Sequence, residues 1–309
     1  MYGAHALNSA WLDLEIAQQQ QRLEGLQALL EDLSASAQSN LKDTARAIEH
    51  DRSGRSAGGM QLVIKREEST LSDDENGRSI PTLQRDGEVY LLDLGDGENR
   101  LTADWLGAVE AHLDEVQAAP APRALVTKAT GKFWSNGLDL EWMAAHQDVL
   151  ESFLPRMHEL LARVLALDVP AVAALQGHTF AAGAMLALAH DQRVMRADRG
   201  FFCLPEIDIR IPFTPGMNAL IAARLSARTA HEAMTTGRRY GGLDAAAAGI
   251  VEEAVDAERV LPRAIELAAA LAGKDPATLA VIKQRLYSSA LAALRDRSSN
   301  GLAIAEGSS

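Results

Sequence analysis

From residue 80 onward, short apolar runs alternate with longer amphipathic segments, and this alternation limits the possible folds more than any other feature. The apolar runs are typical of short buried strands at 89–94, 124–127, 171–175 and 193–195. The segments between them predict helices at 103–116, 147–167 and 182–189. Such alternation predicts an α/β fold with helices covering the sheet. From Pro215 onward the pattern is almost purely helical, and Pro276 is expected at the start of a late helix.

The segment before residue 80 has a different composition, which predicts three parts. Residues 1–60 are expected to form a helical N-terminal extension, 61–79 a linker rich in polar residues, and 80–309 the main domain with a helical C-terminal part. In the extension, apolar residues at helical spacing predict an amphipathic helix: Leu12, Ile16, Leu23, Leu26, Leu30 and Leu33. Two interpretations stay open, namely an interaction helix (a short coiled coil or one docked on a partner subunit) and a loosely attached extension.

The charge and cysteine content exclude several classes of protein. The formal net charge is −12, which disfavours nucleic acid and anionic membranes as partners. An anionic substrate would therefore need a local basic patch. Cys203 is the single cysteine, so we expect no disulfide framework, no cysteine-based metal site and a reducing, cytoplasmic location. No apolar run reaches about 18 residues, so no membrane span is expected.

The first segment with chemical significance spans residues 131–140, GKFWSNGLDL. Asn136 and Gly137 tolerate the backbone angles of a tight turn. Such a turn can point a backbone amide into a cleft, and Leu138 is the first residue after it. Asp139 is expected to cap the next helix and is given a structural role. Alone, this composition is that of an ordinary turn.

The second segment spans residues 176–185, QGHTFAAGAM, at a predicted junction between strand and helix. Its small residues let a ligand approach the backbone closely, and the amides at a helix N-terminus carry partial positive charge. Two such amides meeting at one oxygen would form an oxyanion hole. The alternative is tight helix packing through Ala and Gly. His178 is interpreted as a structural hydrogen-bonder rather than a base.

The third segment, residues 201–209, FFCLPEIDI, places Glu206 among large apolar side chains. Burial there would raise its pKa and strengthen it as a base. The alternative is an ion pair with Arg199 or Arg210. Asp208 is a second candidate, because an extended chain would put it on the same face as Glu206. The sequence shows no serine-hydrolase elbow, phosphate loop, dinucleotide fingerprint or recognisable metal-ligand spacing.

In this order and at these separations, the three segments resemble the crotonase, or enoyl-CoA hydratase/isomerase, superfamily. The resemblance covers roughly residues 80–290 and is greatest for the plant-type monofunctional enoyl-CoA isomerases. Further matching segments are 95–101, 190–191, 195–196, 198–200 and 206–209. The resemblance implies a spiral of ββα units with a helical C-terminal region, assembly as trimers or pairs of trimers, and an acyl-CoA thioester substrate with no other cofactor and no metal.

Carried over by position, the resemblance also assigns roles to individual residues. The backbone amides of Leu138 and Ala182 would form the oxyanion hole, and Glu206 would be the catalytic base. Substrate contacts would come from Ser135, Asn136, Gly137 and Met185. Residues 211–216 are expected to line the acyl tunnel, and Lys132, Lys283 and Arg285 are candidates for contact with the CoA phosphates.

One departure from the superfamily pattern points to a reaction. Hydratases use two glutamates, and the position of the first is Met185 here. Methionine cannot activate water, whereas moving a double bond from 3-enoyl-CoA to 2-enoyl-CoA can proceed with Glu206 as a single base. Pro205 is another departure, since this residue is usual in hydratases. The alternatives are a hydratase or thioesterase on the same scaffold, and a non-catalytic acyl-CoA-binding or assembly protein.

Overall fold

The computed structural model describes residues 80–300, and the predictions for residues 1–60 and 61–79 lie outside this range. The main sheet has six strands in the order β1-β2-β3-β5-β7-β9. β1 pairs with β2 in an antiparallel hairpin, and the other neighbours are parallel. The strands are β1 (Thr82–Asp86), β2 (Val89–Asp93), β3 (Ala124–Lys128), β5 (Ala171–Leu175), β7 (Gln192–Arg196) and β9 (Glu253–Val255).

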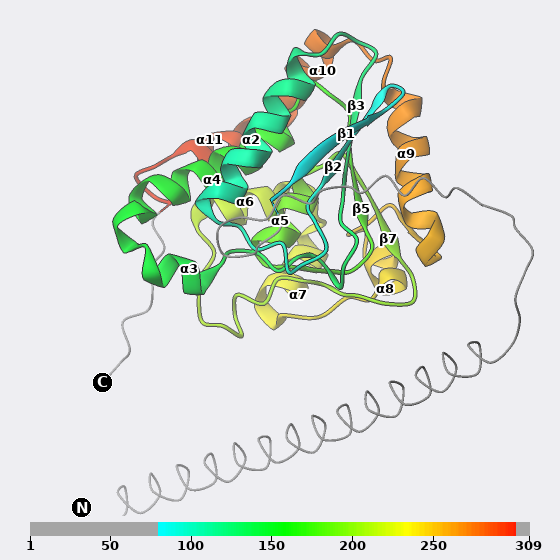
Figure 1. The fold of residues 1–309 in the computed structure, drawn as a ribbon. Helices are drawn as coiled ribbons and strands as arrows, with labels where there is room; N and C mark the ends of the chain where they lie inside the picture. Colours follow the sequence, from blue (N-terminus) through cyan, green and yellow to red (C-terminus); the bar gives the residue numbers. More distant parts are fainter. Residues whose placement is uncertain (1–79, 301–309) are drawn as a thin grey trace, which may run out of the picture. The chain divides into compact units, whose positions relative to one another are not determined.

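Helices cover both faces of this sheet, as the alternating pattern predicts (Figure 1). One face packs against α9 (Val260–Leu271) through small and branched residues: Val126, Val172, Ala174 and Val194 from the sheet, with Val260, Ala264 and Ala268 from the helix. The larger core on the other face is formed with α2 (Ala103–Ala118), α4 (Leu150–Leu165), α5 (Ala182–Ala189), α6 (Pro215–Arg224) and α11 (Ser288–Arg295).

A second sheet of three short parallel strands lies beside the first, in the order β4-β6-β8. Its strands are β4 (Phe133–Ser135), β6 (His178–Phe180) and β8 (Phe202–Cys203). Each follows a strand of the main sheet and is followed by a helix, so β3-β4-α3, β5-β6-α5 and β7-β8-α6 repeat one ββα unit. The predicted fold of repeated ββα units with a helical C-terminal region is therefore confirmed.

The remaining elements refine the sequence prediction. They are α3 (Leu140–Ala145), α7 (Ala227–Thr236), α8 (Gly242–Ala247), α10 (Pro276–Leu286) and the 3-10 helices η1 (Gln147–Val149) and η2 (Ala257–Arg259). Pro276 does begin a helix, and Asp275 caps it. The C-terminal region is not purely helical, because β9 extends the main sheet at its edge. Between residues 80 and 300, no helix combines the length and apolar character that crossing a membrane requires.

One predicted CoA contact is instead part of the core. Lys283 is only 5% exposed, and its Nζ lies 2.7 Å from Asp191 Oδ2. The same carboxylate oxygen accepts a hydrogen bond from the amide of Ala171 at the start of β5. Lys283 therefore links α10 to the main sheet and does not face a substrate phosphate. The prediction was wrong because sequence alone does not distinguish a buried lysine from an exposed one.

We expect Asp191→Ala to lower the free energy of unfolding by about 3–5 kcal/mol, because it leaves a buried ammonium group without its partner. Urea denaturation followed by circular dichroism measures the change. The control is Glu159→Ala, which removes the exposed pair of Glu159 and Arg295 and should cost about 1 kcal/mol or less. Equal losses in the two variants would show that the buried pair contributes no more than a surface one.

Candidate active site

The first amide-bearing turn follows β4. Gly137 has φ +84°, a left-handed conformation that favours glycine. Its carbonyl accepts from the Leu101 amide at 2.9 Å, and the Asp139 amide donates to the Leu101 carbonyl at 3.2 Å. These two hydrogen bonds involve the Gly137 carbonyl and the Asp139 amide, on either side of Leu138, and do not involve the Leu138 amide. Asp139 accepts from the Trp142 amide and caps α3, as predicted.

The second amide-bearing turn joins β6 to α5. Ala181 stands at the helix N-cap with φ 50° and ψ −126°, a strained conformation for a residue with a side chain. Its carbonyl accepts the first intrahelical bond, from the Met185 amide at 3.0 Å. The amide of Ala182 therefore lies in the first turn of α5, where backbone N–H groups have no partner within the helix.

These two turns are in direct contact. A Cβ atom added at Gly137 would lie 3.0 Å from the Ala182 nitrogen and 2.9 Å from the Ala181 Cβ. A Cβ atom added at Gly183 would lie 2.6 Å from the Ser135 Oγ. Only glycine fits at either position, so the small residues of the two sequence segments serve one purpose. They let the backbone of one turn pack against the backbone of the other.

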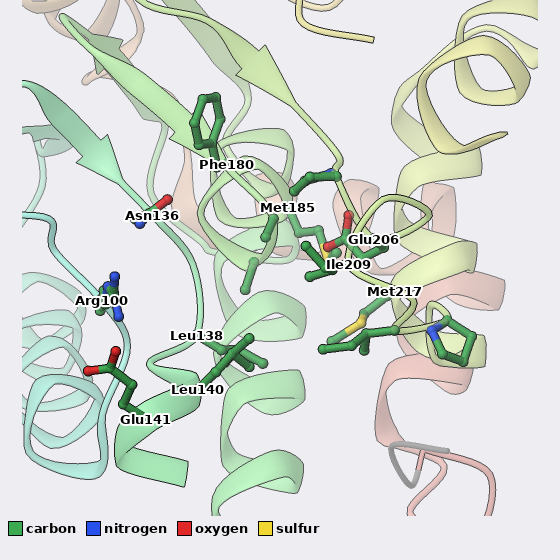
Figure 2. A pocket seen from close by; sticks show the side chains of 15 residues that line it. Arg100, Asn136, Leu138, Leu140, Glu141, Phe180, Met185, Glu206, Ile209 and Met217 are labelled. Carbon is green, nitrogen blue, oxygen red and sulfur yellow. The ribbon is translucent and has the colours of Figure 1, made fainter. Parts of the chain in front are cut away.

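A cavity of about 350 Å³ opens where the turns meet (Figure 2). Five of the predicted site residues line it: Asn136, Leu138, Ala182, Met185 and Glu206. Ser135 and Gly137 differ from the prediction, since neither lines the cavity. Ser135 is fully buried, and its hydroxyl donates to the Asn99 carbonyl and accepts from the Gly137 amide. Its role is to hold the turn.

Glu206 is buried at the cavity wall, with 6% of its surface exposed. In the part of the chain that the structure describes, its Oε2 has no hydrogen-bond partner, and no ion pair includes this residue. The alternative of a pair with Arg199 or Arg210 is therefore wrong. Burial raises the pKa of Glu206 from its ordinary value of 4.5 to about 7. A carboxyl group with this pKa can both accept and return a proton near neutral pH.

The backbone around Glu206 forms a closed turn rather than an extended strand. The amides of Asp208 and Ile209 donate to the Pro205 carbonyl, and the Ile211 amide donates to the Glu206 carbonyl at 3.0 Å. Arg210, with φ +58°, closes the turn. Asp208 therefore does not share a face with Glu206. It is exposed and lies near Gly237, where an added Cβ would come within 2.5 Å of its Oδ2.

His178 does not line the cavity, in agreement with its structural interpretation. Its ring packs against three phenylalanines, with centroid distances of 5.3 Å to Phe133, 5.0 Å to Phe180 and 5.6 Å to Phe201. Burial is the main cause that lowers the pKa of His178. The positive charges of Lys132, Arg199 and Arg239 lower it further. His178 therefore contributes aromatic packing rather than the hydrogen bond that the sequence suggested.

Sequence reasoning missed the polar side of the cavity. Arg100 and Glu141 line it opposite the apolar residues (Figure 2). The Arg100 Nε lies 2.5 Å from Glu98 Oε2. The same oxygen accepts a hydrogen bond from the side-chain Nδ2 of Asn136 at 3.0 Å. These contacts with Asn136 and Arg100 lower the pKa of Glu98. The signal was present, since Arg100 belongs to the 95–101 segment that carries part of the family resemblance.

The described residues contain no group of three or more His, Cys, Asp or Glu side chains placed to hold a metal ion. The cavity is lined by one buried carboxyl group, residues of the two touching turns and a largely apolar wall.

Comparisons with known proteins find relatives that are similar in sequence and in fold. The profile of the enoyl-CoA hydratase/isomerase family matches residues 88–301, which is more than half of the chain. Enoyl-CoA delta isomerase 3 from Arabidopsis thaliana is 35% identical over 236 residues, covering 72% of this chain and 98% of the relative. The peroxisomal enoyl-CoA delta isomerase 2 from the same plant is 35% identical over 224 residues, covering 67% and 91%.

Among solved structures, the apo enoyl-CoA isomerase from Mycobacterium tuberculosis matches with a TM-score of 0.65 and 27% identity. The match covers 70% of this chain and 95% of that protein. The resemblance that the sequence shows to this superfamily, and to its plant-type isomerases, is confirmed.

The buried carboxyl group should be visible in the pH dependence of stability. The folded-state pKa of Glu206, about 7, lies above its ordinary 4.5, so its stabilising contribution is complete below about pH 4.5. That contribution is lost as the pH rises through about 7. Glu206→Gln stays neutral, so its advantage in melting temperature over the wild type should grow across this window.

Thermal unfolding between about pH 4 and about pH 9 measures this difference. Asp208→Asn is the control, because it removes an exposed carboxylate two residues along the same turn and should give no comparable trend. A constant offset between Glu206→Gln and the wild type at every pH would contradict a perturbed carboxyl group at this position.

Proposed function

We propose that this chain, which belongs to the enoyl-CoA hydratase/isomerase family and is an enzyme of that superfamily, moves the double bond of a 3-enoyl-CoA to the 2-position. One observation carries the proposal: the buried carboxyl group of Glu206, whose Oε2 has no hydrogen-bond partner among residues 80–300, lines the same cavity as Leu138 and Ala182 of the two touching turns. The isomerase names of the plant relatives support the same reaction.

The thioester oxygen would lie between the backbone amides of Leu138 and Ala182. Both residues line the cavity, and their turns touch through Gly137. Negative charge that develops on this oxygen would be stabilised by the two N–H groups and by the N-terminus of α5. Because the amides are fixed by backbone packing, they need no rearrangement when the charge appears.

Glu206 would shuttle the proton. Its ionised form removes a proton from C2, and the electrons delocalise over the double bond to give a dienolate. The protonated side chain then returns the proton at C4, so the group is regenerated and no water is consumed. A pKa of about 7 suits both steps, since neither protonation state of Glu206 is strongly favoured near neutral pH.

Met185 argues against hydration on the same scaffold. It is 1% exposed and lines the cavity with an apolar side chain. The other carboxylate lining the cavity is Glu141, which is exposed on the opposite side (Figure 2). With no second acid beside Glu206 among these residues, the site is suited to internal proton transfer and not to water addition.

The polar side of the cavity supports binding of the CoA moiety. Arg100 lines it, and Lys132 is exposed, with its ammonium group 5.4 Å from the Phe133 ring centroid. Because Arg100 is paired with Glu98 and Glu141 lines the same side, the additional positive charge for an anionic thioester would come from Lys132, on a chain with a net charge of −12. We propose that CoA enters as part of the substrate and that no further cofactor takes part.

We expect Glu206→Gln to lower kcat for 3-hexenoyl-CoA by about 10²–10⁴-fold, because the amide cannot accept the C2 proton. Formation of the 2-enoyl product, followed by its absorbance, measures turnover. Binding of butyryl-CoA by calorimetry is the control and should be nearly unchanged. Unaltered turnover in the variant would remove Glu206 from the reaction, and hydration of 2-hexenoyl-CoA by the wild type would identify a hydratase instead.

A second test addresses the amides without touching an ionisable group. Gly137→Ala places a methyl group against the Ala182 nitrogen, so it should displace one amide and lower kcat by about 10²–10³-fold. The control is Gly97→Ala, because an added Cβ there meets nothing within 4 Å. Equal activity of the two variants would show that the contact between the turns does not position the amides.

A further inference from the structure

The main cavity has a polar side and an apolar side (Figure 2). Arg100, Asn136 and Glu141 lie on the polar side, whereas Met185, Ile209 and Met217 lie on the other, next to Glu206. On the proposed function, the thioester lies between the two sides at the amide-bearing turns. The CoA moiety then takes the polar side, and the acyl chain runs along the apolar side past Glu206.

The apolar side ends at a wall that has a second cavity behind it. Glu206, Ile211 and Pro212 line the main cavity and also a neighbouring cavity of about 590 Å³, and of these three Ile211 and Pro212 are apolar. The second cavity is lined mainly by apolar groups, with Ile207, Phe213 and Met234 beyond the wall. The main cavity, at about 350 Å³, is near the lower end of the range for ligand pockets, roughly 300–1,000 Å³, although it must hold both thioester and acyl chain.

This wall is part of the turn that holds the catalytic carboxyl group. The Ile211 amide donates to the Glu206 carbonyl, and Arg210, in a left-handed conformation, closes the turn between them. Pro212 then fixes φ at the next position. The Ile211 side chain therefore cannot swing away by a backbone movement that leaves Glu206 in place. A tail that reaches the wall would meet the Ile211 side chain.

We propose that Ile211, supported by Pro212, is the residue that sets the acyl chain length, and that it restricts this enzyme to short acyl chains by closing the main cavity off from the second one. This inference rests on the proposed function. The second cavity would receive the tail of a longer chain only when the Ile211 side chain is shortened.

The test compares kcat/KM for 3-hexenoyl-CoA and 3-hexadecenoyl-CoA. The wild type should strongly favour the shorter substrate. Ile211→Ala should shift the ratio toward 3-hexadecenoyl-CoA by about tenfold or more, the size of effect that a few methylene groups produce in an apolar pocket. Ile207→Ala is the matched control, because Ile207 lies in the same turn and lines the second cavity but not the main one. Its ratio should equal that of the wild type.

A binding experiment separates this proposal from the proposed function. Calorimetry with butyryl-CoA and palmitoyl-CoA should show that Ile211→Ala improves the affinity for palmitoyl-CoA alone, whether or not either protein turns over. Ile211→Val removes less side-chain volume. It should therefore change the kcat/KM ratio and the affinity for palmitoyl-CoA in the same direction as Ile211→Ala, but to a smaller extent. A wild type that accepts both chains equally, or equal shifts in Ile211→Ala and Ile207→Ala, would overturn the proposal. Absence of isomerisation with an intact chain-length effect on binding would overturn the proposed function alone.

Discussion

The contact between the backbone of Gly137 and the N-terminus of α5 is the constraint on which the site depends. Side chains at Gly137 or Gly183 would overlap atoms of the opposing turn, so the two ββα units can approach this closely only through glycine. The approach carries a conformational cost, because Ala181 adopts a strained backbone conformation beside it. What it provides is a pair of amides from separate units at one edge of the cavity. Neither unit could form that pair alone.

Glu206 represents a second cost that the fold must offset. The rise of its pKa from 4.5 to about 7 corresponds to roughly 3 kcal/mol against the ionised form. This is a considerable part of the stability of a typical domain. The surrounding core is large, and α5, at its centre, has all eight of its residues buried. A core of this size can sustain one unpaired carboxyl group, and the same burial makes the group a stronger base when it is ionised.

The sequence predicted four strands of the main sheet, β2, β3, β5 and β7, because each contains an apolar run that is buried between helices. The strands at the two edges, β1 and β9, were missed because neither is a buried apolar run. The strands of the small sheet, with two or three residues each, are too short to show any periodicity, so β4, β6 and β8 were missed. The sequence indicated the two turns at the cavity because their glycines and alanines have small side chains and allow close contact between backbones. The sequence did not indicate the position of a side chain where that position depends on packing or on backbone hydrogen bonds. The positions of Ser135 and Lys283 depend on neighbours that are distant in sequence, and that of Asp208 depends on the hydrogen-bonded turn that follows Pro205.

The turn from Pro205 to Pro212 shows how one local structure can link reactivity with specificity. Its first part places the Glu206 carboxyl group at the cavity, and its last part, Ile211 and Pro212, lines the same cavity. Arg210, between them, holds a conformation that costs free energy and that glycine would adopt more easily. Because a backbone hydrogen bond from Ile211 to Glu206 joins both ends, a change in the number of residues in the turn would also displace Glu206. A substitution of the Ile211 side chain alters the wall and leaves this backbone hydrogen bond in place. An insertion or a deletion in the turn would displace Glu206.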